Sequence, residues 1–244
     1  MITIICHAQN QTDQKGLKQG HWIKKYPHGV TMYEGTFVDN HPVGEFKRYY
    51  DTGILQSVMN FSDDGKEADA VLYYPGGKPA SKGHYSNQLK TGKWQFFSPD
   101  SSYVINEETY KSDRKEGLSV KFYPGGKTAE KINYSNDLRN GEWIRYYENG
   151  NLWIKASYAS NLLHGKFESW HENGKLQMSG MYKYDRKEGP WMIFDQNGVL
   201  LYKITYTEGV PDNRQMDIDA SNLIDSLEKN KGTIPDPEKT GEMW

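Results

Sequence analysis

The chain repeats itself every 24 residues over most of its 244-residue length, and this constrains the fold more than any single motif. The clearest copy opens at Gly141 and has aromatic residues two, five, six and seventeen positions later, with Gly at nine and Leu at eleven. Positions within a repeat are written +n from its first residue. The first residues of the eight copies are Gly20, Gly44, Ala68, Gly92, Gly117, Gly141, Gly165 and Gly189. One step is 25 residues long, because Ser101 or Ser102 is inserted. Such a period predicts a repeat architecture over residues 20–212 rather than a central globular core.

Each repeat has the pattern of a β-hairpin. The first strand is expected at +1 to +6, and a turn such as 148–150 follows, with Gly150 supplying a positive φ angle. Proline at the first turn position of three repeats favours a three-residue loop that closes in a glycine bulge. This loop pairs +5 with +11, so we expect +3, +5, +11, +13 and +15 to share the buried face. Eight hairpins at about 10 Å each predict an elongated antiparallel sheet about 80 Å long.

The N-terminal residues resemble the end of an export signal. Residues 1–8 are mostly apolar and finish on the small residue Ala8, and a polar stretch without predicted structure follows at 9–19. We expect the mature protein to be extracytoplasmic, whether periplasmic, at the outer surface or secreted. The alternative is an ordinary frayed terminus, which would leave the protein cytoplasmic.

The C-terminal residues 213–244 form a tail outside the repeats. An amphipathic helix is expected near 219–231, with Asp219 as its N-cap and apolar residues spaced three and four apart. The helix is predicted to cap the open end of the sheet, and docking to a partner is the alternative. Residues 233–244 contain two prolines and are expected to be disordered.

Composition excludes several functional classes. The net charge of −2 does not support a nucleic-acid binder, and no apolar run is long enough for a transmembrane segment. Cys6 is the single cysteine, so the chain has no internal disulfide and no cysteine-based zinc site. The seven histidines lack the spacing of metal ligands, and no group of residues has a catalytic pattern. We therefore predict a protein that is not an enzyme and needs no metal or cofactor.

The pattern Gly-x-Trp-x-x-Tyr-Tyr-x-x-Gly-x-Leu, closing on Tyr before the next Gly, resembles the MORN-repeat variant. More narrowly, it is similar to the bacterial YwqK-type family, whose members are often labelled antitoxins. The resemblance implies a curved sheet of stacked hairpins that serves as a binding or assembly surface. The chain departs from the pattern at five positions, which would interrupt an aromatic ladder: Ala68, Ala70, Ser98, Ser119 and Asp195.

The candidate binding surface is the face formed by +2, +4 and +6. Tryptophan and tyrosine flank Lys or Arg there, and such side chains are enriched at protein interfaces. The simpler interpretation is that these aromatics only stack one repeat on the next. The residues chosen as partner contacts are Trp22, Phe46, Arg48, Tyr50, Trp143, Arg145, Tyr147, Phe167 and Trp191. The predicted function is a scaffold for an unidentified protein partner, and the resemblance implies an antitoxin-like role. Binding of a carbohydrate or small ligand at the cell surface and association with a membrane surface are the alternatives.

Overall fold

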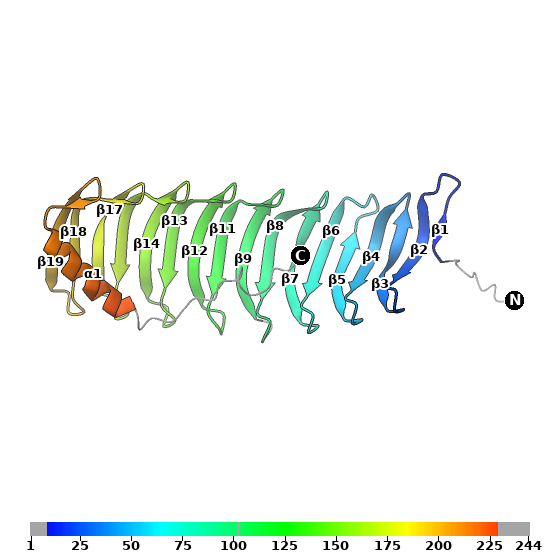
Figure 1. Ribbon diagram of the computed structural model, residues 1–244, viewed down its shortest axis with the longest axis horizontal. Coiled ribbons are helices and arrows are strands. Elements are labelled where there is room, and N and C mark those ends of the chain that lie inside the picture. The colour runs from blue at the N-terminus through cyan, green and yellow to red at the C-terminus, as the bar shows by residue number, and fades with distance from the viewer. Residues whose placement is uncertain (1–8, 102, 229–244) are drawn as a thin grey trace. The chain divides into compact units, whose positions relative to one another are not determined.

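The computed structural model describes residues 9–228 except residue 102, and the predictions made for residues 1–8 and 229–244 lie outside this part. Apart from one helix the described chain is all-β, and its 20 strands pair antiparallel (Figure 1). This confirms the predicted class of stacked hairpins. The contacts divide the chain into two units: unit 1 comprises residues 1–104 and 109–114, and unit 2 comprises residues 105–108 and 115–244.

Unit 1 contains the first three repeats and most of the fourth. Its strands are β1 (Gln11–Thr12), β2 (Lys18–Lys25), β3 (Thr31–Val38), β4 (His41–Tyr49), β5 (Leu55–Phe61), β6 (Glu67–Tyr73), β7 (Pro79–Ser86) and β8 (Leu89–Phe97), together with parts of β9 (Val104–Lys111) and β10 (Arg114–Lys115). β1 pairs with the start of β2, so the prediction that residues 9–19 are unstructured is wrong. The Asn10 side chain adds to this pairing. Its Oδ1 accepts a hydrogen bond from the Ile23 N–H, and its Nδ2 donates one to the Ile23 carbonyl.

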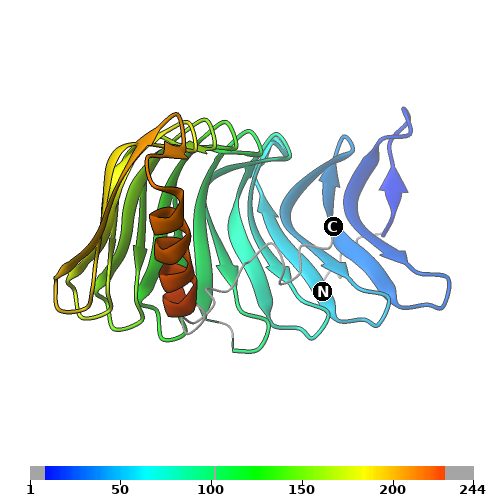
Figure 2. The same ribbon diagram turned by 60° about the vertical axis from the view of Figure 1, so that its left-hand side comes forward.

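Unit 2 contains the remaining repeats and the helix. Its strands are β11 (Gly117–Phe122), β12 (Thr128–Ser135), β13 (Leu138–Tyr146), β14 (Leu152–Ala159), β15 (Leu162–Leu163), β16 (Gly165–Trp170), β17 (Leu176–Lys183), β18 (Arg186–Phe194), β19 (Leu200–Thr207) and β20 (Val210–Pro211), and the helix is α1 (Arg214–Glu228). Figure 2 shows α1 lying across one face of these strands. The helix begins earlier than predicted, because Asn213 rather than Asp219 accepts the N-capping hydrogen bond, from Met216 N–H at 3.0 Å.

Two kinds of turn alternate along each unit. The three-residue loop is confirmed: in the sixth repeat Gly150 has φ 94°, and Tyr146 (+5) pairs with Leu152 (+11). The other turn has two residues, both with positive φ, such as Asn136 and Asp137. That geometry is typical of a type I′ hairpin turn and replaces the polar loop expected between repeats.

A second bulge changes which side chains share a face. The ladder shifts at Trp153, so Arg145 (+4) pairs with Ile154 (+13) and Trp143 (+2) pairs with Ala156 (+15). The prediction that +3 and +5 share a face with +13 and +15 is therefore wrong. We call the face formed by +2, +4, +13, +15 and +17 the core face. In the eighth repeat its members Trp191, Ile193, Ile204 and Tyr206 are buried, and Tyr202 at +13 is half-buried.

Aromatic rings at +2 pack on the +15 residue of the preceding repeat. A large side chain at one of these two positions is paired with a small residue at the other. Trp191 lies directly over Gly180, where an added Cβ would sit 2.2 Å from the ring. Phe46 on Gly35 and Trp94 on Gly83 repeat this arrangement. Where +2 is small, as at Ala70, the paired +15 residue is large, here Met59. The departure from the repeat at Ala70 is therefore a packing solution.

Helix α1 packs on the core face of unit 2. Ala220 is buried in the same hydrophobic cluster as Trp191 and Tyr206, and Met216 and Ile224 pack against that cluster. Tyr206 donates a hydrogen bond to Asp217 on the helix at 2.5 Å. No described helix is long and apolar enough to cross a membrane.

Candidate binding surface

All nine predicted partner contacts lie at +2, +4 or +6, but they differ in accessibility. Tyr147, Phe167 and Trp191 are buried in the core cluster of unit 2, whereas Trp143 and Arg145 in the same unit are half-buried. In unit 1, Arg48 is exposed and the other three candidates, Trp22, Phe46 and Tyr50, are half-buried. Partner contact remains a prediction for all nine, and the accessible residues are the better placed for it.

The tyrosines at +6 join one repeat to the next. Tyr50 donates its hydroxyl hydrogen bond to the carbonyl of Tyr73 at 2.7 Å, and Tyr147 donates to that of Trp170 at the same distance. Corresponding bonds are made by Tyr26, Tyr74 and Tyr123. Burial raises the pKa of Tyr50 and of Tyr123, so the hydroxyls keep the proton that the bond needs. The +6 position therefore has a structural role whether or not it also contacts a partner.

A basic side chain two residues before the opening glycine covers the aromatic rings of several repeats. In unit 2, Lys187 lies 5.2 Å from the ring centre of Trp191, and Arg139 lies 4.2 Å from that of Tyr158. Each nitrogen of the Arg139 guanidinium also donates a hydrogen bond: Nε to the Asn161 side chain at 3.4 Å, and the terminal nitrogens to the Tyr158 hydroxyl and the Asn161 carbonyl, both at 3.1 Å. These cations stabilise the rings from the core face.

Arg145 has a different environment on the same face. Its guanidinium stacks on Trp153 with 4.1 Å to the ring centre, and its Nε lies 3.5 Å from a Glu130 carboxylate oxygen. Glu130 also accepts a hydrogen bond from the Trp143 indole N–H at 3.2 Å and lies 3.8 Å from Lys121 Nζ. We call Lys121, Glu130, Trp143, Arg145 and Trp153 the Arg145 cluster. Two cations share one carboxylate in it.

The Arg145 guanidinium is positioned by Trp153 and Glu130, but its hydrogen-bond donors are not all used. Its Nε is buried and makes no hydrogen bond, and in the described chain its two terminal nitrogens make none either. The side chain is 23% exposed. Arginine carries five N–H donors in a planar fork that matches a carboxylate or a phosphate. The cluster can therefore accept an anionic group from outside the chain.

A second polar group lies on the neighbouring strands, and its members contact one another. Asn106 and Ser119 are buried there; Asn106 donates to Glu108 at 2.8 Å, and Ser119 contacts Asn106 at 3.4 Å. Lys115 pairs with Glu108 at 2.9 Å, so the ion pair is charge-balanced. Ser119 was recognised in the sequence as a departure from the repeat, and the structure places it in this group.

Sequence reasoning selected Arg145 and Trp143 but missed the residues that orient them, which are Lys121, Glu130 and Trp153. A signal for Glu130 was present: it is the one charged residue at +13 among the eight repeats. Trp153 follows Asn151-Leu152 as the residue of the bulge, and nothing in the repeat pattern marks that position. The bulge brings Trp153 under Arg145.

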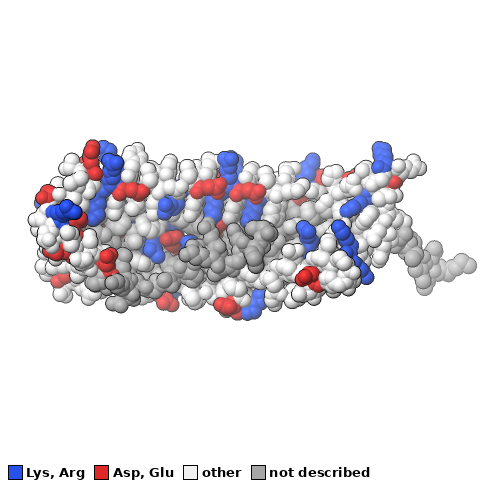
Figure 3. Space-filling model, viewed as in Figure 1, with Lys and Arg blue, Asp and Glu red and all other residues white. Residues whose placement is uncertain are grey.

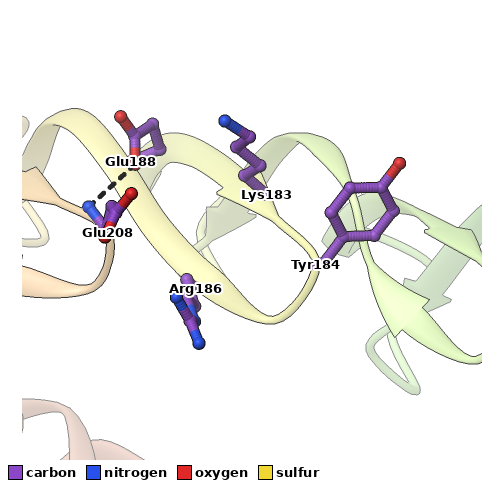
Figure 4. Close-up of a pocket in the computed structure, with 5 residues that line it drawn as sticks. All are labelled: Lys183, Tyr184, Arg186, Glu188 and Glu208. Carbon is purple, nitrogen blue, oxygen red and sulfur yellow. Dashed lines mark hydrogen bonds between the residues drawn. The ribbon is translucent and has the colours of Figure 1, made fainter.

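A shallow pocket lies elsewhere in unit 2, at the two-residue turns. Lys183, Tyr184, Arg186, Glu188 and Glu208 line it, and their side chains point in different directions (Figure 4). The interaction drawn there joins the Glu208 backbone N–H to the Glu188 carboxylate at 3.0 Å. The lining residues do not converge on a common point, so the pocket is a weaker candidate than the Arg145 cluster.

Charges of both signs are interspersed over the view of the surface in Figure 3, with Lys and Arg next to Asp and Glu. No broad patch of one sign is visible there, in keeping with the net charge of −2. Among the described residues, no group of three His, Cys, Asp or Glu side chains is arranged to hold a metal ion. On this face, charge-based recognition therefore depends on local sites.

Comparison with known families finds one match. Six segments of the chain, which together make up just over half of it, match the MORN repeat variant: residues 42–63, 66–87, 115–136, 139–159, 163–184 and 187–208. The repeats that open at Gly20 and Gly92 fall outside these segments, although their strands follow the same order. No curated protein is significantly similar in sequence to the chain.

Proposed function

Because the chain belongs to the MORN repeat variant family, whose repeats are generally interaction modules for proteins and membranes, we propose that it is a non-enzymatic scaffold that binds a protein partner. Its binding surface is the core face of unit 2 around the Arg145 cluster. The observation that carries this proposal is the half-buried, unsaturated guanidinium of Arg145, stacked on Trp153 and placed beside Trp143.

The residue types of the cluster support protein recognition. Tryptophan and arginine dominate the energetic centres of protein interfaces, where they lie in partly closed, well-packed surroundings. Trp153 is buried beneath Arg145, so the guanidinium is already restricted before a partner arrives. Pre-ordering of this kind lowers the entropy cost of binding.

The finer predictions made from sequence, which concern an antitoxin-like role, the location and the alternative ligands, each need a separate test. An antitoxin-like role requires that the partner be a toxic protein whose activity the chain suppresses. An extracytoplasmic location requires a leader that is cleaved near Ala8, which N-terminal sequencing of the mature protein would reveal. Glycan arrays and sedimentation with anionic vesicles address the carbohydrate and membrane alternatives.

The test of the proposal is affinity capture from native lysate, followed by binding of the purified captured protein. Wild type is compared with Arg145→Ser/Trp143→Ser on the core face and with Ile144→Ser/Tyr146→Ser on the opposite face. All proteins are first checked for matching circular dichroism. We expect direct binding to be lost in the core-face variant and retained in the opposite-face variant. Retention in the folded core-face variant would place the interface elsewhere and contradict the proposal.

A further inference from the structure

Resting on the proposed function, we infer that the Arg145 cluster recognises a single carboxylate, supplied by an aspartate or glutamate side chain of the partner protein. Charge favours this ligand. Lys121 and Arg145 carry two positive charges, and the carboxylate they share, Glu130, carries one negative charge. The surplus of one positive charge matches the −1 of a carboxylate better than the charge of a phosphoryl group, which approaches −2 at neutral pH.

The geometry of the guanidinium favours it as well. Trp153 covers one face of the guanidinium and Glu130 lies beside Nε, whereas the two terminal nitrogens make no hydrogen bond within the described chain. Those nitrogens are the pair that binds a carboxylate through two parallel hydrogen bonds. Lys121 Nζ lies 3.8 Å from the other carboxylate oxygen of Glu130, so the site contains a second cation.

Arg139 in the same unit has a contrasting environment. Arg139 also stacks on an aromatic ring, at 4.2 Å from the centre of Tyr158. Its terminal nitrogens, however, donate to the Tyr158 hydroxyl and to the Asn161 carbonyl, and its backbone N–H is bonded to the Asn161 side chain at 2.8 Å. Arg139 thus holds two repeats together, whereas Arg145 lacks such partners. The contrast separates a structural arginine from one available to a ligand.

The experiment uses the full chain and a positional peptide library. Each immobilised hexapeptide pool has one fixed residue, which is Asp, Glu, Asn, Gln or phosphoserine, and the other five positions are random. We expect the Asp and Glu pools to bind at least about tenfold better than the Asn and Gln pools, as befits a charge-assisted bidentate bond. Equal binding of the acid and amide pools would overturn the inference.

Three variants make the test specific. Arg145→Lys keeps the charge and removes the fork, so the acidic preference should fall about tenfold, whereas Arg139→Lys should leave it unchanged in a folded protein. Glu130→Gln raises the surplus charge to two, so binding should shift towards the phosphoserine pool. A wild-type preference for phosphoserine over both acids, or an acidic preference that survives Arg145→Lys, would refute the carboxylate site.

The outcomes also separate this inference from the proposed function. If the acidic preference is absent while a purified partner still depends on Trp143 and Arg145, the scaffold function stands and the carboxylate inference fails. If a partner binds equally to the core-face variant, the proposed surface itself is wrong.

Discussion

The close contact between Gly180 and Trp191 allows a quantitative test of how the repeats pack. A Cβ added at Gly180 would lie 2.2 Å from Cδ2 and 2.3 Å from Cε2 of the indole ring. Carbon atoms in contact are normally about 3.5–4.0 Å apart, so the ring would have to move by more than 1 Å. Trp191 is 1% exposed and touches the rings of Phe167, Tyr182 and Tyr206, which leave no free direction for this movement.

We expect Gly180→Ala to lower the free energy of unfolding by about 3 kcal/mol. This value lies at the upper end of the range for overpacked cores and approaches the cost of removing a buried tryptophan. Trp191→Ala alone should cost about 4 kcal/mol. In the Trp191→Ala background the obstacle is gone, and Gly180→Ala should then stabilise the strand by about 0.5 kcal/mol, because alanine loses less backbone entropy than glycine. The same substitution therefore changes sign with the background.

The assay is urea unfolding followed by circular dichroism for the wild type, both single variants and the double variant. A coupling of about 3.5 kcal/mol between the two sites is expected. Gly76→Ala is the control, because an added Cβ meets no atom within 4 Å there. Additive effects at positions 180 and 191, or a cost below about 0.5 kcal/mol for Gly180→Ala, would refute the packing argument.

Three further perturbations probe the contacts between repeats and one titratable group. Tyr123→Phe removes the hydroxyl that bonds the next repeat at 2.8 Å and should cost about 1 kcal/mol in urea unfolding, and an unchanged midpoint would contradict that role. Asp137 has φ 66°, and its side chain accepts a hydrogen bond of 2.7 Å from the Lys115 N–H. Asp137→Ala should lower the free energy of unfolding by about 2 kcal/mol, whereas Asp137→Asn should lower it by less than about 0.5 kcal/mol. Hydrogen bonds that the His84 ring donates to the carboxylates of Asp69 and Glu67 raise the pKa of His84 above its usual 6.5, so its stabilising effect is fully present below pH 6.5 and is lost as the pH rises through the folded-state pKa. The effect should stay below about 1 kcal/mol because the groups are partly exposed, it should disappear in His84→Gln, and an NMR pKa at or below 6.5 would contradict the assignment.

The repeat period and the turn chemistry made most of the fold predictable. Glycine at +9 specified the three-residue loop, and the structure confirms the pairing of +5 with +11 that follows from it. The two-residue turns had a visible signal as well, because dipeptides such as Asp39-Asn40 tolerate positive φ at both positions. The polar character of these segments alone indicates only a loop and does not specify this turn type.

The assignment of faces failed for a definite physical reason. A strict alternation along the second strand would place Leu152, Ile154 and Ala156 on one side. The bulge at Trp153 inserts one residue, so Ile154 and Ala156 move to the side of Trp143 and Arg145. Consecutive apolar residues at 153 and 154 are compatible with such a bulge, but alternation alone does not reveal it. Sequence reasoning could therefore find Arg145 without finding its ring partner.

The polar residues of the core face are not required by packing. Met59 and Ala70 show that a small +2 residue can be balanced by an apolar +15 residue, and the eighth repeat has Ile193 at +4. Charged groups removed from water generally destabilise a fold relative to apolar side chains of similar volume. The concentration of Lys121, Glu130 and Arg145 on adjoining strands thus carries a cost that the architecture does not demand.

This cost leads to a trade-off between stability and binding. Replacing the three charges together, as Lys121→Leu/Glu130→Met/Arg145→Ile, should raise the free energy of unfolding by about 1–4 kcal/mol, as seen when buried ion pairs become apolar. The same variant should lose the preference for acidic peptides. Arg145→Ile alone should instead destabilise, because it leaves Glu130 with fewer cations. A triple variant less stable than the wild type would show that the charges are structural, and the argument that they are retained for binding would then fail.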